Sequence, residues 1–268
     1  MVQGKQTQPI GIFDSGLGGL TIAKAIIELL PQESIIYFGD TAHLPYGDKS
    51  AVTIQGYSLK IVDWLLKQNC KLILIACSSA SAAADETVKR HVGERATVVN
   101  VIDPVVEYIT QQHHHQRIGL IGTKQTVKSG VYQQKIAALN NAITLHALAT
   151  PLLVPIIEEG FFAHAMMDAA LKEYLSHPSM HDLEALILGC THYPIVKEKI
   201  IKFYNGKITI IDPRPIVAMA VKNILAAHNL LNSRTATKSF YVSDYTESFA
   251  NSTKIFFKKN IPLTLLEL

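Results

Sequence analysis

The chain has few of the features that mark secreted or nucleic-acid-binding proteins. It contains only three cysteines in 268 residues, and none forms a Cys-x-x-Cys pair. This content fits a reducing compartment and argues against a disulfide scaffold or a structural zinc site. The net charge is only +3, from 25 basic and 22 acidic residues, and no basic stripe with interleaved aromatics appears. We therefore expect no nucleic-acid partner.

Long hydrophobic runs are also missing. No apolar run approaches the roughly 20 residues that a membrane span needs, and residues 1–8 lack the apolar core of a signal peptide. We therefore expect a cytoplasmic protein with no membrane contact. No Gly/Ser-rich or Pro-rich linker divides the chain, so any domains must pack closely together.

What the sequence does contain is a regular alternation of short apolar strands and helices. The pattern predicts strands at 10–13, 35–38, 72–75, 98–102, 118–121, 143–148, 185–188, 208–211 and 239–242. It predicts helices at 20–30, 52–67 and near 127–139, and one further helix that holds Glu158, Glu159 and Met166. Strands and helices that alternate in this way form βαβ units, so we expect an α/β fold with mostly parallel sheets.

Cys77 ends the most apolar of these strands. Residues 72–75 are four large apolar residues in a row, which is typical of a central strand buried on both faces. Helix-forming residues follow, opened by serines that can cap a helix. Open α/β sheets bind ligands at this end of their strands, and helix N-terminal amides favour a thiolate. Cys77 is therefore a candidate reactive cysteine.

Three segments of the first half resemble three segments of the second. Residues 10–15 resemble 118–123, residues 72–78 resemble 185–191, and residues 99–104 resemble 208–213. The matches come in the same order and at nearly the same spacing, and they include Cys77 with Cys190 and two Asp-Pro pairs. Similar strands alone explain the apolar content but not these shared polar residues, so we infer an internal duplication.

The duplication predicts two similar Rossmann-like or flavodoxin-like domains related by pseudo-twofold symmetry. We expect the first domain to comprise residues 1–102 plus about 210–268, and the second about 103–209. The active site would lie in the cleft between them, with Cys77 and Cys190 on opposite walls. Two matched groups on opposite faces of a carbon suit stereoinversion: one thiolate removes a proton and the other thiol delivers one to the opposite face.

Other assignments remain open on this evidence from the residues alone. A Cys-His acyl-transfer hydrolase could use Cys190 with His192, although that chemistry needs one nucleophile and an oxyanion hole instead of two cysteines. A non-catalytic amino-acid-binding protein could have the same cleft. Cys70, which opens its strand at the end remote from the cleft, fits the usual role of a free cysteine as an inert buried apolar residue.

The turn at residues 14–19 resembles a phosphate loop only superficially. It lacks the Lys-Ser/Thr of a P-loop, and the third glycine of a dinucleotide fingerprint would fall at Thr21. We interpret it as a turn whose amides hold a carboxylate, with Asp14 available to a substrate ammonium or to a thiol. Its glycines also permit tight strand-to-helix packing.

Three further features have simple explanations. A thiol near its usual pKa of about 8.5 is mostly protonated at neutral pH, so the site should activate one cysteine. His192 is the expected partner of Cys190, and Asp14 of Cys77. Glu158 and Glu159, near an expected helix start, can complement the helix dipole. The run at 113–115 is expected to be a solvated loop, and no metal site is expected.

Taken together, several motifs resemble those of the cofactor-independent glutamate racemases of the aspartate/glutamate racemase superfamily. Nearly the whole chain is covered, and the combination is highly specific. The matching segments are Asp14-Ser15-Gly16-Leu17-Gly18-Gly19-Leu20, residues 40–50 (DTAHLPYGDKS), the cysteine segment at 77, residues 154–160 (VPIIEEG), Gly189-Cys190-Thr191-His192-Tyr193-Pro194, and Asp212-Pro213.

The resemblance implies interconversion of L- and D-glutamate without pyridoxal phosphate or metal, and supply of D-glutamate to bacterial peptidoglycan. It implies that Cys77 acts on the D-isomer and Cys190 on the L-isomer, and that the family's dimers extend to this chain as a homodimer. The implied assisting groups are Asp14, Glu158 and His192. The implied substrate contacts are Asp14, Ser15, Tyr46, Gly47, Ser78, Ser79, Thr191 and His192.

One position departs from the family pattern. The family usually has Asn-Thr after the first cysteine, and this chain has Ser78-Ser79. The missing amide side chain bears on substrate affinity and on the preference for glutamate over aspartate. An aspartate racemase or a broad acidic amino-acid racemase is therefore the alternative.

Overall fold

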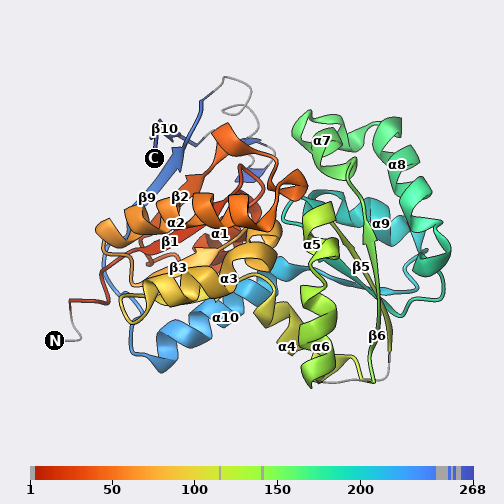
Figure 1. The fold of residues 1–268 in the computed structure, drawn as a ribbon, viewed down its shortest axis with the longest axis horizontal. Helices are drawn as coiled ribbons and strands as arrows, with labels where there is room; N and C mark the ends of the chain where they lie inside the picture. The colour runs from red at the N-terminus through yellow and green to blue at the C-terminus, as the bar shows by residue number, and fades with distance from the viewer. Residues whose placement is uncertain (1–3, 115, 140–141, 246–252, 255, 258–260) are drawn as a thin grey trace.

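The computed structural model describes residues 4–114, 116–139, 142–245, 253–254, 256–257 and 261–268. Its strands form two sheets that lie side by side (Figure 1). The six-stranded sheet contains β1 (Ile10–Asp14), β2 (Ile35–Gly39), β3 (Leu72–Ile75), β4 (Thr97–Asn100), β9 (Lys238–Val242) and β10 (Thr264–Leu265). The four-stranded sheet contains β5 (Arg117–Gly122), β6 (Thr144–Ala149), β7 (Ala185–Gly189) and β8 (Thr209–Ile211).

The two sheets repeat the same arrangement. The order β2-β1-β3-β4 in one corresponds to β6-β5-β7-β8 in the other, and every pairing among these strands is parallel. The register repeats too, because Ile10 pairs with Leu72 and the duplicated Ile118 pairs with Ala185. The two similar, mostly parallel α/β halves predicted from the duplication are confirmed.

Helices cover both faces of each sheet, as parallel strands with crossover connections require. Their bounds are α1 (Leu20–Leu29), α2 (Ala51–Lys67), α3 (Ser78–Val92), α4 (Asp103–Gln112), α5 (Lys124–Lys128), α6 (Val131–Leu139), α7 (Leu153–Glu158), α8 (Ala165–Leu175), α9 (Lys197–Phe203) and α10 (Pro213–Ala227). In the six-stranded sheet, α1 and α10 pack on one face and α2 and α3 on the other, each over a buried apolar cluster.

Two predicted helices are each divided in the structure. The helix expected near 127–139 is α5 and α6, separated at Gly130, whose φ of +65° a glycine adopts readily. The helix expected to hold Glu158, Glu159 and Met166 is α7 and α8, separated by Gly160 at φ +79° and a short 3₁₀ turn. At both glycines the apolar pattern of the sequence continues, but the left-handed backbone conformation interrupts the helix.

A buried ion pair joins the C-terminal segment to the first half. Lys71, just before β3, places its Nζ 2.6 Å from Glu33 Oε2, 2.6 Å from the carbonyl of Gln6 and 2.8 Å from that of Leu230. All three ammonium protons thus have acceptors inside the protein. The backbone amide of Asn232 donates to the other Glu33 oxygen. The chain beyond α10 therefore returns to the first sheet, where β9 lies next to β2 (Figure 1).

The chain crosses between the halves twice, from β4 to α4 and from β8 to α10 (Figure 1). The predicted domain limits near residues 102 and 210 stay a prediction. No helix among the described residues combines the length and apolar content needed to cross a membrane.

Candidate active site

Cys77 lies where β3 ends and α3 begins. Its sulfur caps α3 by accepting a hydrogen bond from the Ala80 amide at 3.5 Å, and its thiol donates to Ser15 Oγ at 3.6 Å. Ser78 and Ser79 are the first residues of the helix. The serines were expected to cap this helix, so that expectation is wrong: the cysteine itself caps it, because it occupies the last extended position.

Cys190 occupies the corresponding place after β7 and is almost as buried as Cys77. Its Sγ lies 3.7 Å from Nδ1 of His192. The other ring nitrogen, Nε2, lies 3.1 Å from a carboxylate oxygen of Glu158. His192 therefore contacts Cys190 through one ring nitrogen and Glu158 through the other.

The two sulfur atoms have opposite electrostatic surroundings. Burial and the neighbouring Asp14 carboxylate raise the pKa of the Cys77 thiol to about 12, although hydrogen bonds from Ala80 and Ser15 partly oppose them. These surroundings favour the thiol form of Cys77 over its thiolate in the ligand-free protein. Asp14, the expected partner of Cys77, thus stabilises the thiol form, because a carboxylate disfavours a nearby thiolate.

His192 has the reverse tendency. Burial disfavours the charged ring, but the Cys190 sulfur and the Glu158 carboxylate outweigh burial and raise the pKa of His192 well above its usual range. This direction favours the protonated, imidazolium form of the ring. The protonated ring places a positive charge 3.7 Å from the Cys190 sulfur.

Asp14, the last residue of β1, is fully buried. Its Oδ1 accepts a hydrogen bond from the Gly16 amide at 2.9 Å. Its Oδ2 has no hydrogen-bond partner in the part of the chain that the structure describes. Burial raises the pKa of Asp14, and the His192 charge partly opposes this. A buried carboxylate oxygen without a partner is costly, and such groups are found at functional sites.

The glycine turn after Asp14 acts as a packing element. The Gly16 amide is used by Asp14, and the Tyr37 hydroxyl donates to the Gly16 carbonyl at 2.8 Å. A Cβ on Gly19 would lie 2.5 Å from Cβ of Asp14, so only glycine permits this approach. These contacts support the packing role of the glycines; whether the turn also holds a substrate carboxylate stays a prediction.

A cavity of about 220 Å³ contains both cysteines in its wall. Its lining includes all of the predicted contact residues except Asp14, which lies behind the wall: Ser15, Tyr46, Gly47, Cys77, Ser78, Ser79, Glu158, Cys190, Thr191 and His192. The volume suits a small amino acid. The wall comes from both halves of the chain, as expected for an interdomain cleft.

Tyr46 is held in this wall by a buried carboxylate. Its hydroxyl donates to Asp40 Oδ2 at 2.5 Å, and burial together with Asp40 raises the pKa of Tyr46. Asp40 also accepts hydrogen bonds from Ser243 at 2.7 Å and contacts the His43 ring nitrogen at 2.8 Å. These contacts fix the loop after β2 against the cavity.

Several lining residues were not predicted. They are Leu44, Pro45, Asp48, Thr123, Lys124, Thr150, Pro151, Val154 and Pro155. The duplication contains the signal for one of them, because Thr123 is the counterpart of Ser15. Its Oγ1 lies 2.8 Å from Oγ of Ser79, so the two hydroxyls join the halves at the cavity wall.

Three simpler expectations have mixed outcomes. Glu158 ends α7, and Glu159 follows it, so the interpretation that they complement a helix start is wrong. His113 is buried and contacts Gln116, so the loop at this point is not simply solvated; residue 115 lies outside the described residues.

Cys70 is a buried, unbridged cysteine in the core under α2. No cluster of three metal-ligating side chains occurs among the described residues.

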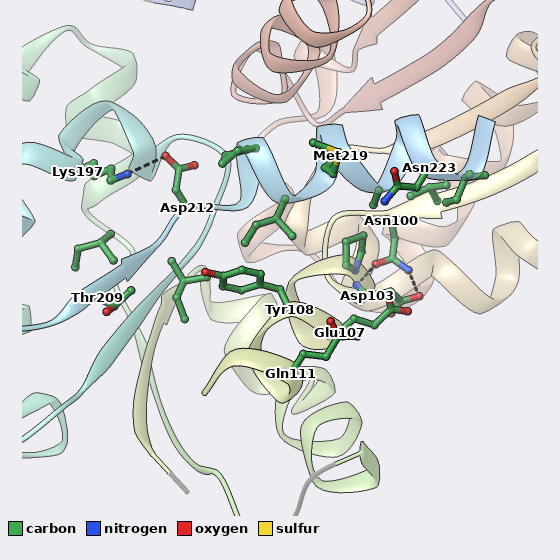
Figure 2. A pocket seen from close by; sticks show the side chains of 18 of the residues that line it. Asn100, Asp103, Glu107, Tyr108, Gln111, Lys197, Thr209, Asp212, Met219 and Asn223 are labelled. Atoms are coloured by element: carbon green, nitrogen blue, oxygen red, sulfur yellow. Dashed lines mark hydrogen bonds and ion pairs between the residues drawn. The ribbon is translucent and has the colours of Figure 1, made fainter. Parts of the chain in front are cut away.

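A larger hollow of about 800 Å³ has no cysteine in its lining. Figure 2 shows the side chains around it. It is bordered by α4, α10 and the edge strands β4 and β8. Asp103 accepts from Asn100 at 2.7 Å, and Asp212 pairs with Lys197 at 3.5 Å (Figure 2). These are the aspartates of the two Asp-Pro pairs, so the hollow marks the two crossings between the halves.

The fold and the site define a class: an α/β enzyme of two similar halves with one acid–base cysteine candidate in each. A family model described as Asp/Glu/hydantoin racemase matches residues 16–221. A glutamate racemase from Chlorobaculum parvum is 41% identical over 256 residues, which cover 95% of this chain and 94% of that protein. The chain belongs to the Asp/Glu/hydantoin racemase family and is an amino-acid racemase.

Solved structures of this family have the same fold. The glutamate racemase from Francisella tularensis, in complex with D-glutamate, aligns with a TM-score of 0.91 at 37% identity and covers 98% of both chains. The glutamate racemase from Thermus thermophilus, in complex with β-chloro-D-alanine, aligns with a TM-score of 0.88 at 34% identity, again over 98% of both.

Proposed function

We propose that this protein is a glutamate racemase that interconverts L- and D-glutamate through two cysteines, without pyridoxal phosphate or metal. The observation that carries the proposal is that Cys77 and Cys190 line one small cavity from opposite halves of the chain. The named relatives support the choice of glutamate, since they are glutamate racemases and one was solved with D-glutamate.

The reaction of L-glutamate begins at Cys190. Its thiolate, paired with the His192 imidazolium, takes the α-proton and becomes a thiol, and the electron pair of the broken C–H bond remains on the α-carbon. The Cys77 thiol then gives its proton to the opposite face and becomes a thiolate. The product is D-glutamate, and the same steps in reverse convert it back.

Asp14 and the substrate ammonium control Cys77 together. In the ligand-free protein, burial and Asp14 raise the pKa of Cys77, which keeps this sulfur protonated and ready to act as an acid. A substrate ammonium bound near Asp14 offsets the carboxylate charge, and so lowers the pKa of Cys77 in the complex. The lowered pKa favours the Cys77 thiolate that acts on D-glutamate. The Cys77 proton passes to water, and Cys190 takes up a proton from water to become the thiol that serves as the acid in this direction.

The remaining lining residues hold the two carboxylates and the ammonium. Hydroxyl groups of Ser15, Ser78, Ser79 and Thr191 and the backbone at Gly47 provide donors for carboxylate oxygens. Lys124 adds a cation at the wall, where its Nζ lies 3.1 Å from Asp48. Ser78 leaves room where the family usually has a longer amide, so aspartate or other acidic amino acids are the alternative substrates.

A Cys-His hydrolase accounts for only one wall of the cavity. It uses Cys190 with His192 but gives no role to Cys77, whose raised pKa makes it a poor nucleophile. The racemase uses both cysteines and both of their charged neighbours.

The cellular role follows from the product. The enzyme supplies D-glutamate to bacterial peptidoglycan. It does so in the cytoplasm, and it acts as a homodimer. Growth of a D-glutamate auxotroph on expression of this chain, and a dimer mass by light scattering, are the expected results.

The decisive experiment follows single-isomer glutamate in deuterated water. We expect optical activity to fall to zero from either isomer, with one deuterium entering at the α-carbon of the product. A thioester trapped on Cys190, or glutamate binding with no α-proton exchange, would instead support the hydrolase or the binding protein. L- and D-aspartate in the same assay measure the substrate preference.

A further inference from the structure

The first half of the chain contacts the catalytic turn of the second half through Thr21. Thr21 is the second residue of α1, and its side chain is buried. Its Oγ1 donates a hydrogen bond of 2.9 Å to the carbonyl oxygen of Thr191, which lies between Cys190 and His192. Thr21 does not line the cavity that holds the cysteines. Its hydroxyl therefore reaches the site through the Thr191 carbonyl.

The other two carbonyls of this turn are satisfied within their own half. The Tyr193 amide donates to the Cys190 carbonyl, and the Ile195 amide donates to the His192 carbonyl, each at 3.1 Å. The Thr191 carbonyl receives its bond from across the cleft. Because buried backbone carbonyls need a partner, this peptide group is held in place by the first half.

Gly18 sets how closely the two halves meet at this point. A Cβ on Gly18 would lie 2.3 Å from Cε1 and 2.5 Å from Nδ1 of His192. The backbone of the turn therefore lies directly against the imidazole ring. Thr21, three residues further on, adds the hydrogen bond that fixes the peptide group before that ring.

The geometry points to Thr21 as a positioning residue for Cys190. The proposal rests on the proposed function, in which Cys190 and His192 form the acid–base pair. The contact between Cys190 Sγ and His192 Nδ1 is already long at 3.7 Å. A small rotation of the peptide group between Thr191 and His192 breaks it. The hydrogen bond from Thr21 prevents this rotation and so keeps the imidazolium beside the sulfur.

A two-variant experiment tests this role. Thr21→Val keeps the shape of the side chain and removes the hydroxyl, and Thr21→Ser keeps the hydroxyl. Thr41→Val is the matched control, because Thr41 is also buried and its Oγ1 donates to a backbone carbonyl, that of Asp244 at 2.6 Å. Kinetic constants and α-deuterium isotope effects on kcat/KM are measured for each glutamate isomer, and circular dichroism monitors folding.

We expect Thr21→Val to lower kcat by about tenfold, since a misplacement of ~1 Å costs about 100-fold and this change loosens the contact less than that. KM should stay within about twofold of the original protein. The isotope effect with labelled L-glutamate should rise, because proton transfer at Cys190 becomes the slow step. With labelled D-glutamate it should fall, because the labelled bond breaks before that step. Thr21→Ser should restore the original values.

Original kinetics in Thr21→Val, or a loss that leaves both isotope effects unchanged as in Thr41→Val, would overturn the proposal. If Thr21→Val does not fold, Thr21→Ala is used with the same readouts, since water can then reach the carbonyl. Cys190→Ser separates the two proposals. Full racemisation in Cys190→Ser refutes the proposed function, whereas an inactive Cys190→Ser with normal Thr21→Val refutes only the positioning role.

Discussion

The two walls of the cavity have the same architecture and opposite chemistry. Cys77 follows β3 and Cys190 follows β7, strands that occupy equivalent places in two sheets of the same order. Their exposed fractions are nearly equal, 5% and 6%. The neighbours differ: a carboxylate, Asp14, accompanies Cys77, and an imidazolium, His192, accompanies Cys190. The repeated fold therefore gives the two thiols equivalent places, and their neighbours give them opposite charges.

The difference between the two thiols cannot appear in every kinetic constant. The two enantiomers have equal free energies, so kcat/KM must be the same in both directions whatever the two thiols do. Unequal proton affinities appear instead in kcat and KM taken separately, in isotope effects and in the reactivity of each sulfur.

The largest expected effect comes from removing either thiol. Cys77→Ser and Cys190→Ser should each lower racemisation by at least about 1,000-fold, since a positioned acid or base contributes about 10² to 10⁴ and both are needed in each turnover. Polarimetry on each isomer measures the loss. Cys70→Ser is the control, because this third cysteine is buried in the core away from the cavity; it should keep its kcat. Full activity in either Cys77→Ser or Cys190→Ser contradicts the mechanism.

A smaller effect is expected from exchanging the charged neighbours. Asp14→Asn removes a charge that raises the pKa of Cys77, so that pKa falls and iodoacetamide alkylates Cys77 faster at neutral pH. His192→Asn removes the cation beside Cys190, and alkylation of Cys190 slows. Peptide mass spectrometry measures both rates in each variant. Slower alkylation of Cys77 in Asp14→Asn would contradict the account in which Cys77 has an anionic neighbour and Cys190 a cationic one.

The third effect in order of size is a shift in the pH dependence of catalysis. Glu158 raises the pKa of His192, so Glu158→Gln lowers it. Catalysis needs the imidazolium, which is lost as the pH rises through that pKa. The alkaline limb of the pH–rate profile should therefore shift to lower pH, and NMR titration of the imidazole should shift with it. Glu159→Gln, at the exposed neighbouring position, should leave the profile unchanged. A shift to higher pH in Glu158→Gln contradicts the assignment.

The smallest effect is expected at Ser78. Ser78→Asn restores the amide that the family usually has in the Cys77 wall, and one added hydrogen bond of ~0.5–1.5 kcal/mol lowers KM by about two- to tenfold. Steady-state kinetics with glutamate and aspartate measure the change. A lower KM for aspartate alone would assign Ser78 to the control of specificity instead.

The main features of the fold could be predicted from local patterns. Apolar strands such as Leu72–Ile75 and the duplicated cysteines specify parallel βαβ units and their end residues. The ends of helices were harder, because apolar periodicity continues past Gly130 and Gly160, where a left-handed backbone ends the helix. For the same reason, the sequence placed Glu158 near a helix start, whereas it is the last residue of α7.

The electrostatics of the site depend on contacts that no local pattern contains. The spacing of Cys190 and His192 indicated that pair, because two residues apart on a turn can meet. The effect of Asp14 on Cys77 joins residues 63 positions apart and exists only once β1 and β3 pair in the first sheet. The contact of Gly18 with His192 and the bond from Thr21 to Thr191 join residues 174 and 170 positions apart, and they exist only after both halves pack.

The most direct test compares the two sulfurs in the ligand-free protein at neutral pH. Limited iodoacetamide labelling, resolved by peptide mass spectrometry, reports each alkylation rate in the same sample. Because the two cysteines have nearly equal exposed fractions and share one cavity, the ratio of their alkylation rates reports mainly the difference in their charged neighbours. We predict that Cys190 reacts faster than Cys77 and that His192→Asn narrows the difference, since Asp14 still acts on Cys77. Equal rates, or faster labelling of Cys77, would contradict the account.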